Sequence, residues 1–96
     1  MTIADLVSTK RNEILRIAAK HGVQRIRLFG SVARGQASPT SDVDFLIEVG
    51  PKHSAFFPGG LVVELEELLG RKVDVVELEG LYAPLKEGVL KDAVPL

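Results

Sequence analysis

The sequence predicts an α+β fold, in which a small mixed β-sheet carries helices packed mainly on one face. Three observations support this prediction: helical spacing of apolar residues near the start, three short aliphatic runs, and further helical segments among and after those runs. A chain of 96 residues is long enough for one domain over 1–96, and a hydrophobic fraction of 46% is enough for a small core.

The first predicted element is a single helix between Thr2 and Gly22. Its apolar residues follow a helical period: Ile3, Leu6, Val7, Ile14, Ile17 and Ala18. Thr2 can cap the start, with Asp5 as a weak partner in a capping box, and Gly22 closes the end. His21 lies near the helix C-terminus, where a positive charge is favourable, and we assign it no further role.

A half-buried first strand is predicted for residues 25–29, because charged and apolar residues alternate there. Gly30 ends this strand, and residues 31–34 are expected to form a short helical turn that Gly35 stops. The polar residues 36–41 then form a loop by composition.

Four further elements and a loop follow. In order they are a central second strand over 43–49, a loop over 52–60, an amphipathic helix over 61–69 that Gly70 stops, a third strand over 72–78 and a last helix over about 84–93. Phe56 and Phe57 in the loop are expected to cover the sheet edge, with stacking on a base or contact with a partner as the alternative. The run Glu64, Glu66 and Glu67 predicts a solvated helix face.

Composition excludes several classes of function. Twelve basic and thirteen acidic residues give a net charge of −1, which argues against direct nucleic-acid binding or an anionic membrane as partner. The chain has no cysteine, hence no disulfide framework and no thiolate metal site, which suits the cytoplasm. No apolar run approaches 18 residues, so no membrane span is expected. His53 has no second His or Cys at ligand spacing, which argues against zinc.

Two carboxylates at a spacing of two mark the start of the second strand. Asp42 and Asp44 share a face there, and like charges this close repel unless a cation lies between them. Asp74 lies in the third strand, where burying it unpaired would be costly, and it joins the pair if that strand lies beside the second. Three carboxylates suit two Mg²⁺ ions, and Asp74 could accept a hydroxyl proton. Alternatively, each aspartate simply ends a strand or caps a turn.

The turn after the first strand could bind phosphate. Gly30 lets a phosphate approach the backbone, and the Ser31 hydroxyl adds a donor. Arg34 could clamp phosphate oxygens or instead pair with an acidic residue. The glycine spacing resembles a P-loop, but Gln36 and Ala37 stand where Lys and Ser or Thr are required, which excludes a Walker-type NTPase.

Three motifs together resemble the minimal nucleotidyltransferases of the DNA polymerase β-like superfamily: Gly30-Ser31-x-Ala33-Arg34-Gly35, Ser41-Asp42-x-Asp44 and Val73-Asp74-Val75-Val76. The resemblance covers nearly the whole chain and implies a polymerase β palm-like fold. It also implies that Gly30 and Ser31 bind the nucleotide triphosphate and that Asp42, Asp44 and Asp74 hold two Mg²⁺ ions.

The same resemblance implies an activity and a partner. Members of this group look like antitoxins that act with a HEPN-domain ribonuclease toxin, transferring AMP from ATP to a tyrosine of the toxin. Two other readings stay open at this point. The chain could neutralise its partner by occlusion without catalysis, or it could adenylylate a small molecule in a site completed by another subunit.

Overall fold

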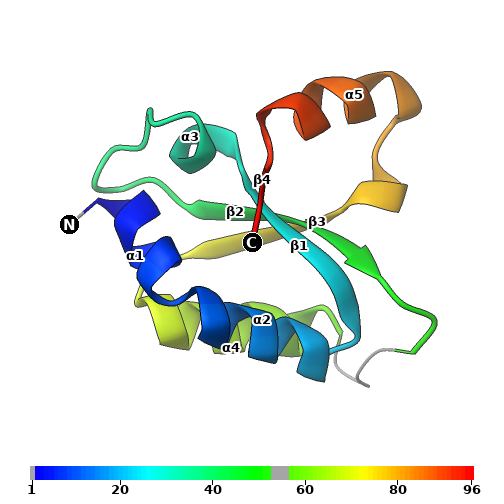
Figure 1. Cartoon of the computed structure of the whole chain (residues 1–96), viewed down its shortest axis with the longest axis horizontal. Coiled ribbons are helices and arrows are strands. Elements are labelled where there is room, and N and C mark those ends of the chain that lie inside the picture. Colours follow the sequence, from blue (N-terminus) through cyan, green and yellow to red (C-terminus); the bar gives the residue numbers. More distant parts are fainter. Residues whose placement is uncertain (1, 53–56) are drawn as a thin grey trace.

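The computed structural model describes residues 2–52 and 57–96. The elements run α1 (Ile3–Thr9), α2 (Arg11–Lys20), β1 (Val23–Phe29), α3 (Gly30–Ala33), β2 (Val43–Val49), α4 (Gly59–Leu69), β3 (Val73–Glu77), the 3₁₀ turn η1 (Leu78–Gly80), α5 (Ala83–Asp92) and β4 (Val94–Pro95) (Figure 1). The predicted α+β class is confirmed. Within the described residues, no helix has the length and apolar character needed to cross a membrane.

The sheet is mixed, as predicted, and its strand order is β3-β2-β1-β4. β2 lies antiparallel to β1 and parallel to β3, so it is an internal strand, in agreement with its apolar sequence. The short strand β4 was not expected: Val94 and Pro95 pair with Leu28 and Arg27 of β1. A strand of two residues, one of them proline, is too short to show the alternation of apolar and polar residues from which a strand is predicted.

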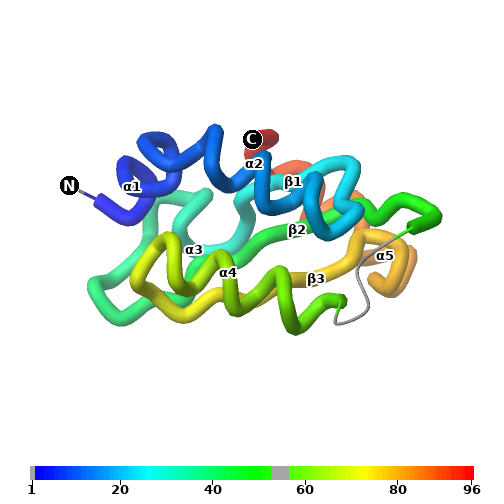
Figure 2. Tube along the Cα trace, turned by 90° about the horizontal axis from the view of Figure 1, so that it is seen from below, coloured from blue at the N-terminus to red at the C-terminus, as the bar shows by residue number. Residues whose placement is uncertain are grey.

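The core lies between the sheet and the helices α1, α2 and α4, which occupy one side of it (Figure 1). Seen from that side, α2 and α4 run next to each other across the strands (Figure 2). The strand β2 supplies three fully buried side chains to this core at alternate positions: Val43, Phe45 and Ile47. The positions between them therefore face the other side of the sheet. This alternation places Asp44 away from the core.

The N-terminal segment is two helices, where the sequence predicted one. Thr2 and Asp5 form the predicted capping box. The helix then breaks at Lys10, where the Thr9 hydroxyl donates to the Asp5 carbonyl oxygen at 2.8 Å. A threonine that bonds back to the carbonyl four residues earlier tends to bend a helix. The polar stretch around Lys10 also offers no apolar residue to hold the helix straight against the core.

His21 and Glu64 have structural roles that the sequence analysis missed. His21 is 6% exposed and pairs with Glu64 of α4, which also accepts a hydrogen bond from Lys20 at 2.7 Å. Glu66 accepts from the Val73 backbone N–H at 3.0 Å. The prediction of a solvated face is therefore wrong for Glu64 and Glu66. These acidic side chains instead tie α4 to α2 and to β3.

We expect Glu64→Gln to lower the stability of the protein at neutral pH. The hydrogen bond from Lys20, followed by that from His21, lowers the pKa of Glu64 below its ordinary value of 4.5. A carboxyl whose pKa is lower in the folded state stabilises the fold above about pH 4.5, and the contribution is lost as the pH falls through the folded-state value. Urea midpoints of wild type and variant should therefore differ at pH 7 and converge once the pH has fallen below the folded-state pKa of Glu64. The exposed Glu67→Gln serves as the control; an equal loss in both variants would contradict the role of Glu64.

The C-terminal helix α5 lies on the opposite side of the sheet from α2 and α4 (Figure 1). None of its ten residues is buried, and Leu85 and Leu90 within it are exposed. In the loop before α4, Phe57 is half-buried and packs against the core, so the core interpretation is confirmed for it. His53 and Phe56 fall outside the described residues.

Candidate functional site

A row of three side chains crosses the sheet at the end of β1. Phe29 of β1 pairs with Asp44 of β2, and Asp44 pairs with Asp74 of β3. Register partners on neighbouring strands project from the same face, with their backbones about 4.8 Å apart. The expectation that the third strand lies beside the second is confirmed. Asp44 and Asp74 therefore meet on the face opposite the core.

Asp44 is the electrostatic centre of this row. Partial burial raises the pKa of Asp44 above its ordinary value of 3.8, and the negative charges of Asp74 and then Asp42 raise it further. The positive charge of Arg34 opposes this rise. Asp74, Asp42 and Arg34 are thus all close enough to influence the carboxyl of Asp44. The like charges make the ionised Asp44 unfavourable unless a cation compensates them.

One reason given for the importance of Asp74 is wrong. The sequence placed it in the middle of an apolar strand, where burial would penalise it. In the structure β3 is an edge strand, only its Val73 is buried, and Asp74 is exposed, as is Asp42. The open edge gives Asp74 access to solvent. Its significance lies in its proximity to Asp44, which the strand register determines.

The three aspartates suit a divalent cation by charge and by ligand type. Carboxylate oxygens are the ligands that Mg²⁺ prefers, and the charges of Asp74 and Asp42 add to burial in raising the pKa of Asp44. Among the described residues, no three His, Cys, Asp or Glu side chains are already grouped as ligands of one ion. The donors come from two strands and a loop.

Gly30 is the residue that lets Asp44 occupy its position. Its φ of +74° lies in the left-handed region, and a Cβ there would overlap Oδ2 of Asp44. Glycine is required here for two reasons, the backbone conformation and the close approach of the carboxylate. Ser31 follows at the start of the four-residue helix α3 and is half-buried. The predicted phosphate turn therefore lies directly against the carboxylate of Asp44.

Arg34 lies on the exposed side of this turn. Its Nε donates to Oε1 of Gln36 at 3.2 Å, and the residue is exposed to solvent. Together with Phe29 and Gly30, Arg34 lines a groove of about 440 Å³ whose other wall is formed by Leu85 and Val89 of α5. The groove thus runs from the phosphate turn along the C-terminal helix.

Arg71 belongs to this region, although the sequence analysis did not identify it. Its Nη2 donates to the carbonyl oxygen of Pro39 and, at 3.1 Å, to that of Ser41, immediately before Asp42. The Nε of Arg71 is buried without a hydrogen-bond partner. The available signal was an arginine three residues before Asp74. However, the contact of Arg71 with Pro39 and Ser41 joins residues about thirty positions apart, and residue spacing in the sequence does not predict such a contact.

A mixed sheet with a glycine turn beside neighbouring carboxylates is typical of enzymes that transfer a phosphorus-centred group. The chain belongs to the nucleotidyltransferase domain family, whose model matches residues 11–96. It is 42% identical over 84 residues to MJ0435 of Methanocaldococcus jannaschii, a candidate protein adenylyltransferase, covering 88% of this chain and 90% of that protein. It is also 32% identical to the protein adenylyltransferase MntA of Thermococcus cleftensis, covering 98% and 95% of the two chains.

Solved structures show the same architecture. A structure described as a candidate minimal nucleotidyltransferase superposes with a TM-score of 0.87 at 40% identity, covering 97% of this chain and 95% of that one. A toxin–antitoxin structure with AMP-PNP has a TM-score of 0.73 at 24% identity, covering 88% and 69%. The structure of a tri-AMPylated HEPN toxin of Shewanella oneidensis in complex with an MNT antitoxin matches with a TM-score of 0.67 at 21% identity. The match covers 92% of this chain and 69% of that one. At these two lower identities the likeness shows the fold alone.

Proposed function

We propose that this chain is a single-domain, Mg²⁺-dependent adenylyltransferase of the cytoplasm that transfers AMP from ATP to a tyrosine of a HEPN-domain toxin and thereby acts as its antitoxin. The observation that carries the proposal is the contact between Gly30 and Asp44, with Asp42 and Asp74 near enough to act on the same carboxyl. A turn that can receive a triphosphate lies directly against a concentration of carboxylates. The relatives named as protein adenylyltransferases support a protein acceptor.

Each residue has a defined part in the proposed reaction. Gly30 and Ser31 hold the triphosphate through the backbone and the hydroxyl, and Arg34 contacts phosphate oxygens from the exposed side. Asp42, Asp44 and Asp74 would hold Mg²⁺, which when bound neutralises phosphate charge and activates the acceptor hydroxyl. Asp74 is exposed at the sheet edge, where an incoming protein can reach it.

The proposed step is a displacement at the α-phosphorus of ATP. The tyrosine oxygen forms a bond to this phosphorus, and the bond to the bridging oxygen of the β-phosphate breaks. Pyrophosphate leaves, and the hydroxyl proton passes to a carboxylate oxygen of Asp74. Arg34 stays beside the phosphates, where its charge favours the negative groups gathered in the transition state.

The test uses ATP labelled at either end of the triphosphate. The chain is incubated with Mg²⁺ and a HEPN-domain toxin, the acceptor that the proposal names. We expect label from the α-phosphorus to become attached to the HEPN protein, at a tyrosine located by mass spectrometry. No label should arrive from the γ-phosphorus.

Two results would contradict the proposal. Transfer of γ-label alone would mean a kinase. An Asp44→Ala variant that binds the HEPN protein, transfers nothing and still suppresses its ribonuclease activity would mean inhibition by occlusion. A variant of the HEPN protein with the modified tyrosine changed to phenylalanine is the matched control, because it keeps the aromatic ring and removes the acceptor oxygen.

A further inference from the structure

The loop before Asp42 has no regular structure of its own to hold it in place. Residues 35–40 are all exposed. Ser41 follows them, and Asp42 comes next. Hydrogen bonds within the loop, such as the Ser38 N–H to Oγ of Ser41 at 2.8 Å and the Ser41 N–H to the Ser38 carbonyl oxygen at 3.0 Å, maintain its local shape. They do not connect it to the sheet.

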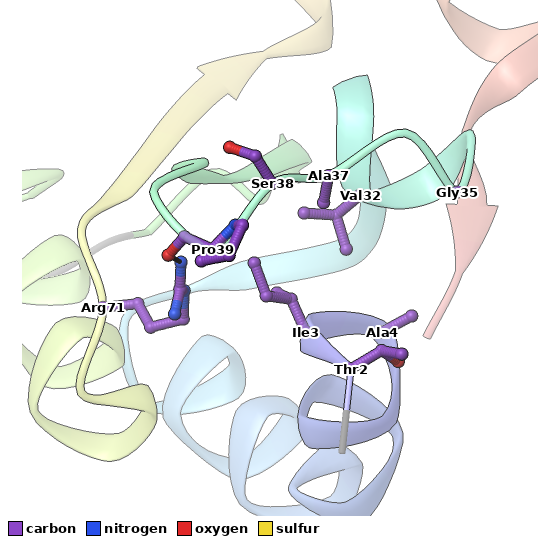
Figure 3. Close-up of a pocket in the computed structure, with 9 residues that line it drawn as sticks. All are labelled: Thr2, Ile3, Ala4, Val32, Gly35, Ala37, Ser38, Pro39 and Arg71. Atoms are coloured by element: carbon purple, nitrogen blue, oxygen red, sulfur yellow. Dashed lines mark hydrogen bonds between the residues drawn. The ribbon is translucent and has the colours of Figure 1, made fainter.

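Packing does not fix this loop either. A cavity of about 410 Å³ lies beside it, lined by Ala37 and Pro39 of the loop, by Val32 next to Ala37, and by Ile3 of α1 (Figure 3). A segment that spans a cavity lacks the close contacts that normally fix a backbone. Asp42 is anchored on one side by Val43, which is buried and pairs with Val73 in the sheet. On its other side, the preceding loop needs a further interaction to hold it.

In the part of the chain that the structure describes, hydrogen bonds from a distant segment to residues 37–41 come from Arg71. Figure 3 shows its side chain reaching from the turn after α4 to Pro39, and the same Nη2 also donates to Ser41. Arg71 lies three residues before Asp74, and its own position is fixed by the sheet. The backbone carbonyl oxygen of the next residue, Lys72, accepts a hydrogen bond from the Val43 N–H at 2.9 Å. Arg71 thus joins the start of β3 to the loop before β2.

We propose that Arg71 is a positioning residue for Asp42, holding this carboxylate beside Asp44 and Asp74 by fixing the carbonyls of Pro39 and Ser41. The inference rests on the proposed function, since it concerns a residue assigned there to metal binding. Asp44 and Asp74 are placed by strand register and need no such support.

The experiment compares Arg71→Met, Arg71→Lys and the control Arg25→Met, in which an exposed arginine of β1 is changed. The first readout is Mn²⁺ affinity in the presence of a non-hydrolysable ATP analogue. We expect Arg71→Met to weaken Mn²⁺ binding and lower kcat by about 10- to 100-fold, the usual effect of losing a residue that orients a metal ligand. The KM for ATP should change less than kcat, because the phosphate turn is on another segment. Arg71→Lys should recover part of the loss, and Arg25→Met should resemble wild type.

A double variant separates positioning from general damage. If Arg71 acts through Asp42, Arg71→Met should weaken Mn²⁺ binding no further in a protein that already carries Asp42→Asn. Amide hydrogen exchange should also accelerate over residues 38–42 and stay unchanged in β2. An additional loss of affinity in the double variant, or unchanged exchange and affinity in both Arg71 variants, would overturn the inference while leaving the proposed function intact. A wild-type protein that binds no Mn²⁺ would overturn both.

Discussion

Replacing Asp44 with asparagine is expected to lower the rate of nucleotidyl transfer by about 10³-fold. Stabilisation of transition-state charge by a metal ion is worth several kcal/mol, and each 1.4 kcal/mol is about tenfold in rate. The charges of Asp42 and Asp74 both act on the carboxyl of Asp44, so its loss removes the centre of the proposed ligand set. Initial rates of AMP transfer with the HEPN protein in excess measure the effect.

The same substitution should stabilise the metal-free protein. The pKa of Asp44 is higher in the folded protein than its ordinary 3.8, through burial and then through Asp74 and Asp42. The ionised carboxylate therefore destabilises the fold at neutral pH, and the stability present below pH 3.8 is lost as the pH rises through the folded-state value. The thermal midpoint of Asp44→Asn should exceed that of wild type at pH 7, with no difference below pH 3.8.

The control for Asp44→Asn is a variant that loses the same charge elsewhere. Glu67→Gln also removes one negative charge but lies exposed on α4, away from the site, and should change neither rate nor midpoint. High salt should reduce the stability difference at Asp44, because that residue is partly exposed and screening weakens the repulsion. If Asp44→Asn transferred AMP at the wild-type rate, the assignment of Asp44 as a metal ligand would be wrong.

Replacing Gly30 with alanine should reduce activity by about 100-fold or more, the effect that a displacement of about 1 Å at a reacting centre can have. The new Cβ would overlap Oδ2 of Asp44, and the carboxylate would have to move away from the turn. The left-handed backbone at φ +74° adds a cost of about 1–2 kcal/mol for any residue with a Cβ. Both stability and transfer should therefore fall.

Gly35→Ala is a matched control for Gly30→Ala. Gly35 has nearly the same φ, +71°, but no atom lies within 4 Å of where its Cβ would be. Gly35→Ala should lose only the stability that the left-handed backbone costs, and Gly30→Ala should lose more because of the overlap with Asp44. Only Gly30→Ala should lose most of its activity. Equal losses of activity in the two variants would show that backbone strain, and not the contact with Asp44, accounts for the effect.

Most of the secondary structure could be predicted from local patterns. The strand over 43–49 was predicted with the bounds that the structure has, because its apolar run is long and Gly50 with Pro51 ends it. The first helix was less well predicted, since the periodicity of its apolar residues is interrupted by a polar stretch in which the Thr9 side chain competes for a backbone carbonyl. The strand β4 exists only because β1 offers it an edge.

The sequence by itself predicted a pair of carboxylates, Asp42 and Asp44, at the start of the second strand and a glycine turn at the end of the preceding strand. The structure places Asp44 in β2 and Asp42 immediately before it. Both predictions rest on patterns over a few residues. Only the tertiary structure decided that Asp74 stands opposite Asp44, that it lies exposed on an edge strand, and that Arg71 reaches the loop before Asp42. These relations join segments about thirty residues apart. They depend on strand register and on helix packing. Both are set by the free energy of the whole chain, so they leave no local pattern in the sequence.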